Sequence, residues 1–321
     1  MRLKEGEHDF LIAASENETG SAYSYNLNKE YEKNEIWNNI GGTMTMVQIP
    51  ESLSFLATQR FYPGFNAASC ELVRLSFVDG KWEQKKVRDF PYLHRFDLIE
   101  RNSKIYFIGA TITEKKEYME DWRTPGSIYV GEYDRNANQL INLKVITNNL
   151  IKNHGYSAFK EKNYSLITSE EGIFRLNYPT SESDWSIQQV YDLPVSDIAA
   201  IDFYQTGELS HYLVINKFHG KKLTILNNKF QIIKEIEEKF PFSHSIWGGV
   251  INGKPCFLFG NREGKQDYYM IDLVEEDSAL EVKFNKIDHQ VGSTNTLVYN
   301  KNDINYIASA NREINQVAIY Q

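Results

Sequence analysis

Short apolar runs separated by polar turns recur along the whole chain. The runs are rich in Val, Ile, Tyr and Phe and are bounded by Gly, Asn, Asp or Ser. Short runs of β-branched and aromatic residues with such boundaries are typical of strands. Helical periodicity is limited to 116–121 and 147–152, which are short enough to be loop turns. The pattern therefore predicts an all-β protein, with strands that include 10–14, 53–57, 105–108, 128–131, 212–215, 257–259, 268–273 and 306–308.

The last third of the chain contains two similar segments. Residues 244–274 and 295–320 each read as a strand, a polar turn, a second strand ending in Gly or Ala and Asn-Arg-Glu, and a third strand. The Asn-Arg-Glu triplets stand at 261–263 and 311–313. A further strand at 280–288 completes the first segment as a four-stranded meander. A repeat of about 40 to 50 residues has the size of a propeller blade.

The same template extends toward the N-terminus. An insertion at 112–126 lengthens one unit, and residues 9–40 supply three further strands. We therefore predict a single domain, residues 1–321, built as a β-propeller of seven four-stranded antiparallel blades, with six blades as the alternative. Residues 1–6 are expected to add a strand to the last blade. The first strands of the other six units are expected to begin near Thr43, His94, His154, Asp197, His244 and Asn295.

Segment 244–264 resembles the FG-GAP and VCBS repeats of seven-bladed propellers. In those repeats an inner strand is followed by a turn like Ile251-Asn252-Gly253 and by a second strand ending in Gly-Asn, here Gly260-Asn261. The paired Asp residues that can hold calcium in such repeats are absent, so no calcium site is expected at this turn. The chain is also loosely similar to propeller-type sugar lyases and dehydratases, and this resemblance implies carbohydrate chemistry.

The charge and composition of the chain limit the classes of partner that it is expected to bind. The chain has 35 basic and 43 acidic side chains, a formal net charge of −8 and no basic run. Nucleic acids and anionic membranes require clustered Lys and Arg, so we expect neither as a partner. No apolar stretch approaches the roughly 20 residues of a membrane helix, and no secretory signal is visible. The two cysteines read as reduced core thiols. We expect a cytoplasmic protein with a small-molecule or oligosaccharide ligand.

Three of the seven histidines fall at one position of the repeat. The first strand of each propeller blade lines the central channel, so residues where these strands begin converge. Imidazoles with a carboxylate suit a divalent metal such as Zn, Mn or Fe. The alternatives are histidines that only bond to water and backbone, and direct acid–base or sugar contacts. The predicted metal ligands are His94, His154, His244 and Asp197.

The loops that join second and third strands open on the same face and carry amide, guanidinium and aromatic groups. Such groups suit a hydroxylated or carboxylated ligand, because hydroxyls need both donors and acceptors. For each residue the alternative is a solvated loop position. For the two Asn-Arg-Glu triplets it is a structural role, in which Arg bridges neighbouring blades and Glu fixes it by a salt bridge. The predicted substrate-binding residues are Arg60, Tyr62, Arg95, Trp122, Arg123, Trp247, Asn261, Arg262, Asn311 and Arg312. His211 is expected at the surface.

These features together predict a carbohydrate-processing enzyme, a metal-assisted lyase, dehydratase or isomerase acting on a sugar derivative. The metal would polarise a carbonyl or carboxylate, and Tyr156, His219 or Glu263 would accept the adjacent proton. One alternative is a non-catalytic propeller that binds a glycan or a protein partner. Another is a two-carboxylate glycosidase, which is less favoured because the inner positions carry His more than acid.

Overall fold

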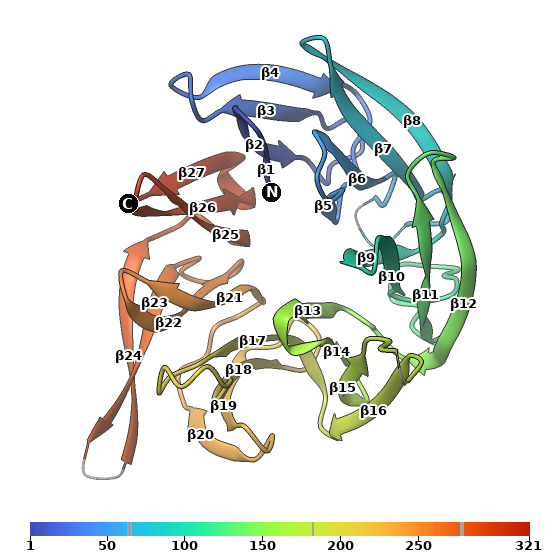
Figure 1. The fold of residues 1–321 in the computed structure, drawn as a ribbon. Coiled ribbons are helices and arrows are strands. Elements are labelled where there is room, and N and C mark those ends of the chain that lie inside the picture. Colours follow the sequence, from blue (N-terminus) through green and yellow to red (C-terminus); the bar gives the residue numbers. More distant parts are fainter. Residues whose placement is uncertain (63, 65, 182, 277–278) are drawn as a thin grey trace. The chain divides into compact units, whose positions relative to one another are not determined.

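The computed structural model describes residues 1–62, 64, 66–181, 183–276 and 279–321. In this part of the chain the strands form seven antiparallel sheets (Figure 1). Six of these sheets have four strands in sequential order, and the last, β25-β26-β27, has three. Each sheet is a meander of one continuous segment, the arrangement of a propeller blade. The predicted all-β, seven-bladed propeller is therefore confirmed.

The chain divides into two compact units, each described separately below. Unit 1 comprises Met1–His154, Lys160–Asn163 and Tyr178–Ser186. Unit 2 comprises Gly155–Phe159, Tyr164–Asn177 and Ile187–Gln321. The single-domain organisation stays a prediction.

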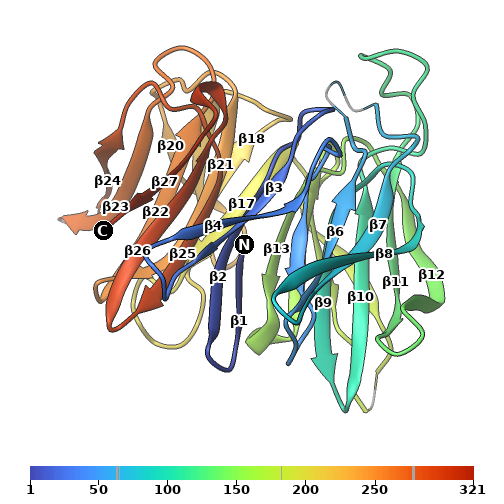
Figure 2. The same cartoon turned by 90° about the horizontal axis from the view of Figure 1, so that it is seen from above.

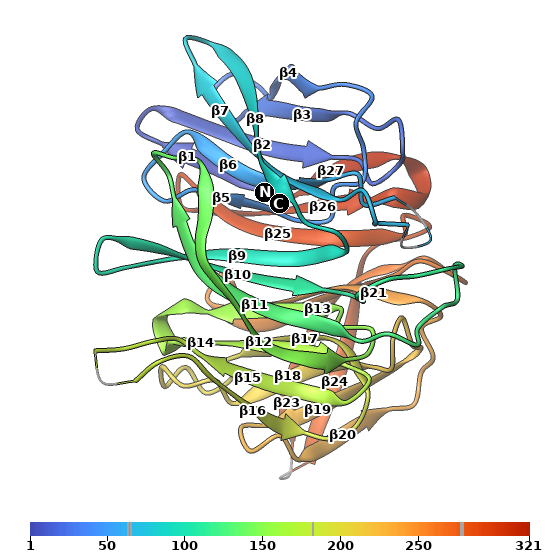
Figure 3. The same ribbon diagram turned by 90° about the vertical axis from the view of Figure 1, so that its right-hand side faces the viewer.

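Unit 1 contains three sheets and the short 3-10 helix η2 (Lys160–Lys162). Strands β9 to β12 lie side by side in sequence order (Figures 2 and 3). The predicted insertion is the loop between β10 and β11. The strands are β1 (Arg2–Glu5), β2 (His8–Ala14), β3 (Ala22–Asn26), β4 (Glu32–Trp37), β5 (Met46–Gln48), β6 (Ser54–Gln59), β7 (Glu71–Val78), β8 (Lys81–Asp89), β9 (Leu93–Arg101), β10 (Lys104–Thr111), β11 (Gly126–Asp134) and β12 (Gln139–Leu150).

Strand β1 corrects one expectation about the N-terminus. It was expected to complete the last blade, but it pairs antiparallel with β2 and completes the first. The physical reason is local: Gly6, with φ of 56°, allows a tight turn back onto β2. Arg2 also donates two hydrogen bonds of 2.7 Å to the buried carboxylate of Asp9. A hairpin closes with little loss of chain entropy, so this local pairing is readily formed.

Unit 2 contains four sheets and the 3-10 helix η3 (Arg312–Ile314). Strand β16 begins at Ser186, which unit 1 includes. The strands are β13 (Gly155–Phe159), β14 (Tyr164–Ser169), β15 (Gly172–Asn177), β16 (Ser186–Tyr191), β17 (Val195–Ile201), β18 (His211–Asn216), β19 (Lys222–Asn227), β20 (Ile232–Ile236), β21 (Ser243–Ile251), β22 (Lys254–Asn261), β23 (Tyr268–Glu276), β24 (Ala279–Asp288), β25 (Ser293–Lys301), β26 (Ile304–Asn311) and β27 (Gln316–Tyr320).

Apolar side chains on alternating strand positions build the cores. In unit 2, Ile201 and Leu213 of one sheet pack in a cluster with Phe257 and Phe259 of the next. Burial of such side chains contributes about 1.5–3 kcal/mol each. Cys70 and Cys256 are buried and unbridged, as predicted, and burial raises the pKa of each thiol to about 12.

The two Asn-Arg-Glu triplets serve the fold of unit 2. The Arg262 guanidinium donates to Glu313 Oε1 at 2.9 Å and lies 4.7 Å from the ring centroid of Phe242. Arg312 donates to the same carboxylate oxygen at 3.2 Å. The arginine of the first triplet thus bridges to the glutamate of the second, in the neighbouring blade. The structural alternative stated for these triplets is the one observed.

Candidate functional site

The predicted histidine position coincides with a recurring bulge. In four of the described first strands the pairing register skips one residue where the strand begins: His94, Ser196, His244 and Thr294. His154 occupies the equivalent place, because it precedes Gly155, which pairs with Thr168 of β14. A bulge leaves one residue outside the ladder and redirects its side chain, and bulges are enriched beside active sites. We call these five residues the bulge station.

Asp197 lies one residue beyond the bulge station. It pairs with Ile215, while its neighbour Ser196 takes the bulged position. Asp197 is buried and accepts a hydrogen bond of 2.8 Å from the Ser196 hydroxyl. The repeat alignment placed Asp197 with the histidines because sequence spacing cannot show which residue leaves the ladder.

Unit 1 holds two histidines of the bulge station together. The rings of His94 and His154 have centroids 4.6 Å apart, and both residues are buried. His94 Nδ1 lies 3.2 Å from the carbonyl oxygen of His154. A carbonyl oxygen only accepts hydrogen bonds, so Nδ1 of His94 donates in this contact.

Unit 2 holds a second pair. The ring centroids of His219 and His244 are 5.1 Å apart, and both rings are partly exposed. His244 Nδ1 lies 3.0 Å from the carbonyl oxygen of Thr294, so this nitrogen also donates. The ring of His219 stacks between Phe218 and Phe242, at centroid distances of 4.0 and 4.4 Å. His219 has a left-handed backbone, with φ of 45°.

Phe218 and Phe242 are site residues that the sequence reasoning missed. In the sequence each phenylalanine lies within two residues of a predicted site histidine, in Phe218-His219-Gly220 and Phe242-Ser243-His244. Such flanking aromatics read equally well as core residues, so only the structure could separate the two roles.

The other predicted catalytic residues have different surroundings. Tyr156 Oη accepts a hydrogen bond of 2.7 Å from the Ser165 hydroxyl, which orients the phenol. Glu263 is exposed, and its backbone N–H donates to the Pro241 carbonyl oxygen at 3.3 Å. Both belong to unit 2.

Several predicted substrate-binding residues of unit 1 already have protein partners. The hydrogen bond from Arg60 to Glu71 raises the pKa of the Arg60 guanidinium. Arg95 donates to the Met44 carbonyl oxygen at 3.1 Å. Arg123 donates to Asp121 and Glu117, and Lys116 Nζ lies 3.7 Å from the ring centroid of Trp122. Tyr62 is half-buried, and its backbone N–H donates to Asn66.

The predicted residues of unit 2 are mainly structural. Asn261 and Asn311 are buried; their amides donate to the Pro241 carbonyl oxygen and to Gln316 Oε1, respectively. Arg262 and Arg312 both reach Glu313, as described above. Trp247 packs against the core cluster of β22 and β23. These contacts support the loops, so we keep only Trp247 of this group as a ligand-contacting candidate.

Buried acceptors without a partner lie close to the bulge station. Two of the described buried oxygen atoms that accept no hydrogen bond are Asn153 Oδ1 and Asn216 Oδ1. Asn153 precedes His154 in the chain, and Asn216 pairs with Val195, the residue before Ser196. A buried polar atom left unsatisfied costs about 1–3 kcal/mol. These atoms are suited to donors supplied from outside the protein.

No protein-family model matches the chain, and no curated protein matches it. Solved structures do match. A periplasmic gluconolactonase of Pseudomonas aeruginosa, PpgL, is 8% identical with a TM-score of 0.63, covering 97% of this chain and 95% of that one. A candidate 6-phosphogluconolactonase of Bacteroides uniformis is 11% identical with a TM-score of 0.62, covering 97% and 91%. The WD40 propeller domain of Doa1 is 9% identical with a TM-score of 0.58, covering 100% and 95%.

These similarities define the class of the protein as a seven-bladed β-propeller. The narrower resemblance to FG-GAP and VCBS repeats finds no matching family model. The Asn252-Gly253 turn that suggested it has φ of 50° and 77°, the conformation of an ordinary tight hairpin turn. Within the described residues, no helix has both the length and the apolar character needed to cross a membrane.

Proposed function

We propose that the chain is a carbohydrate-processing enzyme whose bulge-station histidines bind a divalent metal. The observation that carries the proposal is that two histidines of this station, His94 and His244, direct Nδ1 to backbone carbonyl oxygens. Metal-binding histidines usually donate their other ring N–H to such an oxygen, and this hydrogen bond fixes the orientation of the ring.

We propose His154 in unit 1, and His219 and His244 in unit 2, as metal ligands. Imidazoles with open coordination positions suit a catalytic Zn or a related ion. His94, whose ring lies beside that of His154, stays a proposed ligand, as does Asp197. In a propeller the first strands of successive blades face a common channel, which is the reason to expect residues of different blades to share one ion.

The metal would supply Lewis-acid polarisation of a carbonyl oxygen on the sugar derivative. Phe218 and Phe242 stack on His219 and would hold its ring in place beside His244. Tyr156, oriented by Ser165, would move a proton at its phenol oxygen. Arg60, Tyr62, Arg95, Trp122, Arg123 and Trp247 remain proposed substrate contacts.

Two reactions follow from a polarised carbonyl. Removal of the adjacent proton leads to β-elimination or isomerisation, the lyase, dehydratase or isomerase chemistry predicted from sequence. Addition of water to the carbonyl of a sugar lactone leads to ring opening. The names of two structural neighbours, both gluconolactonases, favour lactone hydrolysis as the second candidate.

The test combines metal analysis with a substrate panel. The purified protein is examined by elemental analysis and assayed on sugar lactones and on sugar acids, before and after chelation and reloading with Zn, Mn or Fe. We expect chelation to abolish activity, and His244→Ala to lower the metal content and reduce kcat/KM at least 100-fold. His289→Ala, at an exposed turn, is the matched control and should change neither.

Two results together would contradict the proposal: the protein neither retains nor takes up metal, and the His244→Ala variant binds glycans or proteins as the parent does. The chain would then be a non-catalytic binding propeller.

A further inference from the structure

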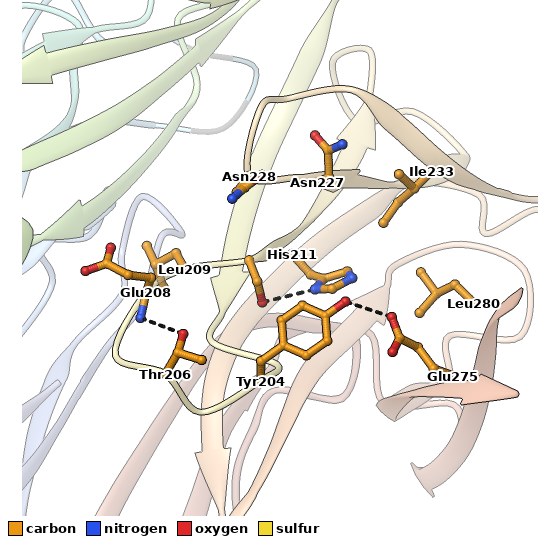
Figure 4. A pocket seen from close by; sticks show the side chains of 11 residues that line it. Tyr204, Thr206, Glu208, Leu209, His211, Asn227, Asn228, Ile233, Glu275 and Leu280 are labelled. Carbon is orange, nitrogen blue, oxygen red and sulfur yellow. Dashed lines mark hydrogen bonds between the residues drawn. The ribbon is translucent and has the colours of Figure 1, made fainter. Parts of the chain in front are cut away.

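Unit 2 contains a pocket that the proposed reaction does not use. Its volume is about 440 Å³, a size suited to a small ligand. Figure 4 shows its lining, which comes from β18, the loop before β18, the end of β19, and the strands β20, β23 and β24. The lining residues are Tyr204, Thr206, Glu208, Leu209, Ser210, His211, Asn227, Asn228, Ile233, Glu275 and Leu280.

A buried histidine forms part of this lining. His211 was expected at the surface, but it is only 4% exposed, and the rings of Phe203 and Tyr204 pack against it at centroid distances of 5.0 and 5.6 Å. This burial lowers the pKa of His211, although Glu275 opposes the shift. The ring is therefore neutral at pH 7.

The hydrogen bonds of Ser210 determine which ring nitrogen of His211 carries the proton. The Ser210 hydroxyl donates to the Ile201 carbonyl oxygen at 3.5 Å and accepts from the Phe203 N–H at 2.9 Å. Since its proton is used, its remaining lone pair accepts from His211 Nδ1 at 3.1 Å. Nε2 of His211 then has a lone pair and acts as an acceptor within the pocket lining.

The charged group opposite is a carboxylate. Glu275 Oε1 accepts a hydrogen bond of 2.7 Å from the Tyr204 hydroxyl, which holds both side chains in place (Figure 4). No Lys or Arg is among the eleven lining residues. Ile233 and Leu280 add apolar surface beside these acceptors.

We propose that this pocket binds a small organic cation, an ammonium group attached to a short aliphatic chain. The ammonium would donate to Glu275 and to His211 Nε2 and would lie near the ring of Tyr204, which attracts cations. The aliphatic chain would contact Ile233 and Leu280. An anion is disfavoured because the lining contains two carboxylates, Glu208 and Glu275, and no Lys or Arg.

The test compares three probes of similar shape on the full-length protein: butylammonium, butan-1-ol and butyrate. Binding is measured by ligand-observed NMR titration at pH 7.5. We expect saturable binding of butylammonium in the millimolar range, at least tenfold tighter than that of either other probe. Equal binding of butan-1-ol, or no saturable binding of butylammonium, would overturn the proposal.

A pair of matched variants tests the site itself. Glu275→Gln removes the proposed contact and should weaken butylammonium binding at least tenfold. Glu276→Gln changes the charge equally, at the adjacent residue, which pairs with Lys283 and does not line the pocket; it should leave the affinity unchanged. The proposal fails if both variants bind butylammonium equally well. Both substitutions replace exposed side chains, so the test requires no substitution of the buried His211.

Discussion

The partner of each histidine Nδ1 decides what the ring can do. In His94 and His244 this atom faces a backbone carbonyl oxygen, and in His211 it faces a serine hydroxyl whose own proton is used elsewhere. These contacts fix the orientation of each ring. The same side chain is proposed to bind a metal in one place and an ammonium group in another, because its neighbours differ.

Burial of His211 makes the stability of the fold depend on pH. Its folded pKa is lowered below the unfolded value near 6.5, so the unfolded chain binds more protons. The contribution of this residue to the free energy of unfolding should therefore fall as the pH drops from 7 through 6.5 toward the folded pKa. Urea denaturation at a series of pH values measures this slope.

His211→Gln should flatten that slope by one proton over the same pH window, whereas exposed His289→Gln should leave it unchanged. Identical slopes in the parent protein and the His211→Gln variant would contradict the prediction.

The ion pair between the two Asn-Arg-Glu triplets should stabilise the fold moderately. The side chains of Arg262 and Glu313 are 15% and 27% exposed, so solvent screens the pair only in part. We expect Arg262→Met to lower the free energy of unfolding by roughly 1 kcal/mol, at the upper end for surface pairs. A double-mutant cycle with Glu313→Gln gives the coupling energy.

The exposed pair of Lys29 and Glu32 is the comparison for that cycle, and its coupling should be near zero. If the coupling between Arg262 and Glu313 is no larger, this ion pair does not explain why the triplet occurs twice.

At the scale of strands, the bulge where each first strand begins is the element that organises the candidate site. It recurs at His94, Ser196, His244 and Thr294. In the fourth blade the corresponding strand begins at Gly155, where the backbones approach closely. A Cβ atom on Gly155 would lie 2.3 Å from Thr168 Oγ1 and 2.5 Å from the Ser196 carbonyl oxygen.

Gly155→Ala should therefore displace the start of β13 and, with it, the neighbouring His154. We expect a loss of about 1–3 kcal/mol in the free energy of unfolding, the usual result of overpacking, together with reduced metal content. Gly6→Ala is the control: a Cβ there meets no atom within 4 Å, so only its left-handed backbone, with φ of 56°, costs about 1 kcal/mol. Equal losses in the two variants would contradict the close-packing argument.

At the scale of the whole molecule, the prediction of a single domain can be tested by cooperativity. Unit 1 contains Trp37, Trp82, Trp122 and Trp185, and unit 2 contains Trp247. Tryptophan fluorescence therefore reports mainly on unit 1, while far-UV circular dichroism reports on the strands of both. One cooperative domain should give coincident urea transitions by the two methods. Two separate transitions would show that the units unfold independently.

Much of the fold could be predicted from the sequence because strand patterns and turns are local. The triplets at 261–263 and 311–313 located two blades, and the predicted starts at Thr43, His94 and His244 lie within three residues of β5, β9 and β21. The pairing of β1 was predicted wrongly, because two alternative partners for an edge strand look alike in sequence.

The candidate site could be predicted only in part. Residue type and spacing identified His94, His154 and His244, because histidines recur at one position of the repeat. Other features depend on strand register and on packing between segments distant in sequence. These are the offset of Asp197, the stacking of Phe218 and Phe242 on His219, and the burial of His211.

The sequence by itself therefore determined the class of fold, the length of the repeat and the repeat position that carries histidines, because all three follow from local patterns of apolar and polar residues. Only the tertiary structure decided between six and seven blades, which atom the Nδ1 of each site histidine faces, which arginines are held in salt bridges and where a second pocket lies. Those properties arise from contacts between residues far apart in the chain, and no local pattern encodes them.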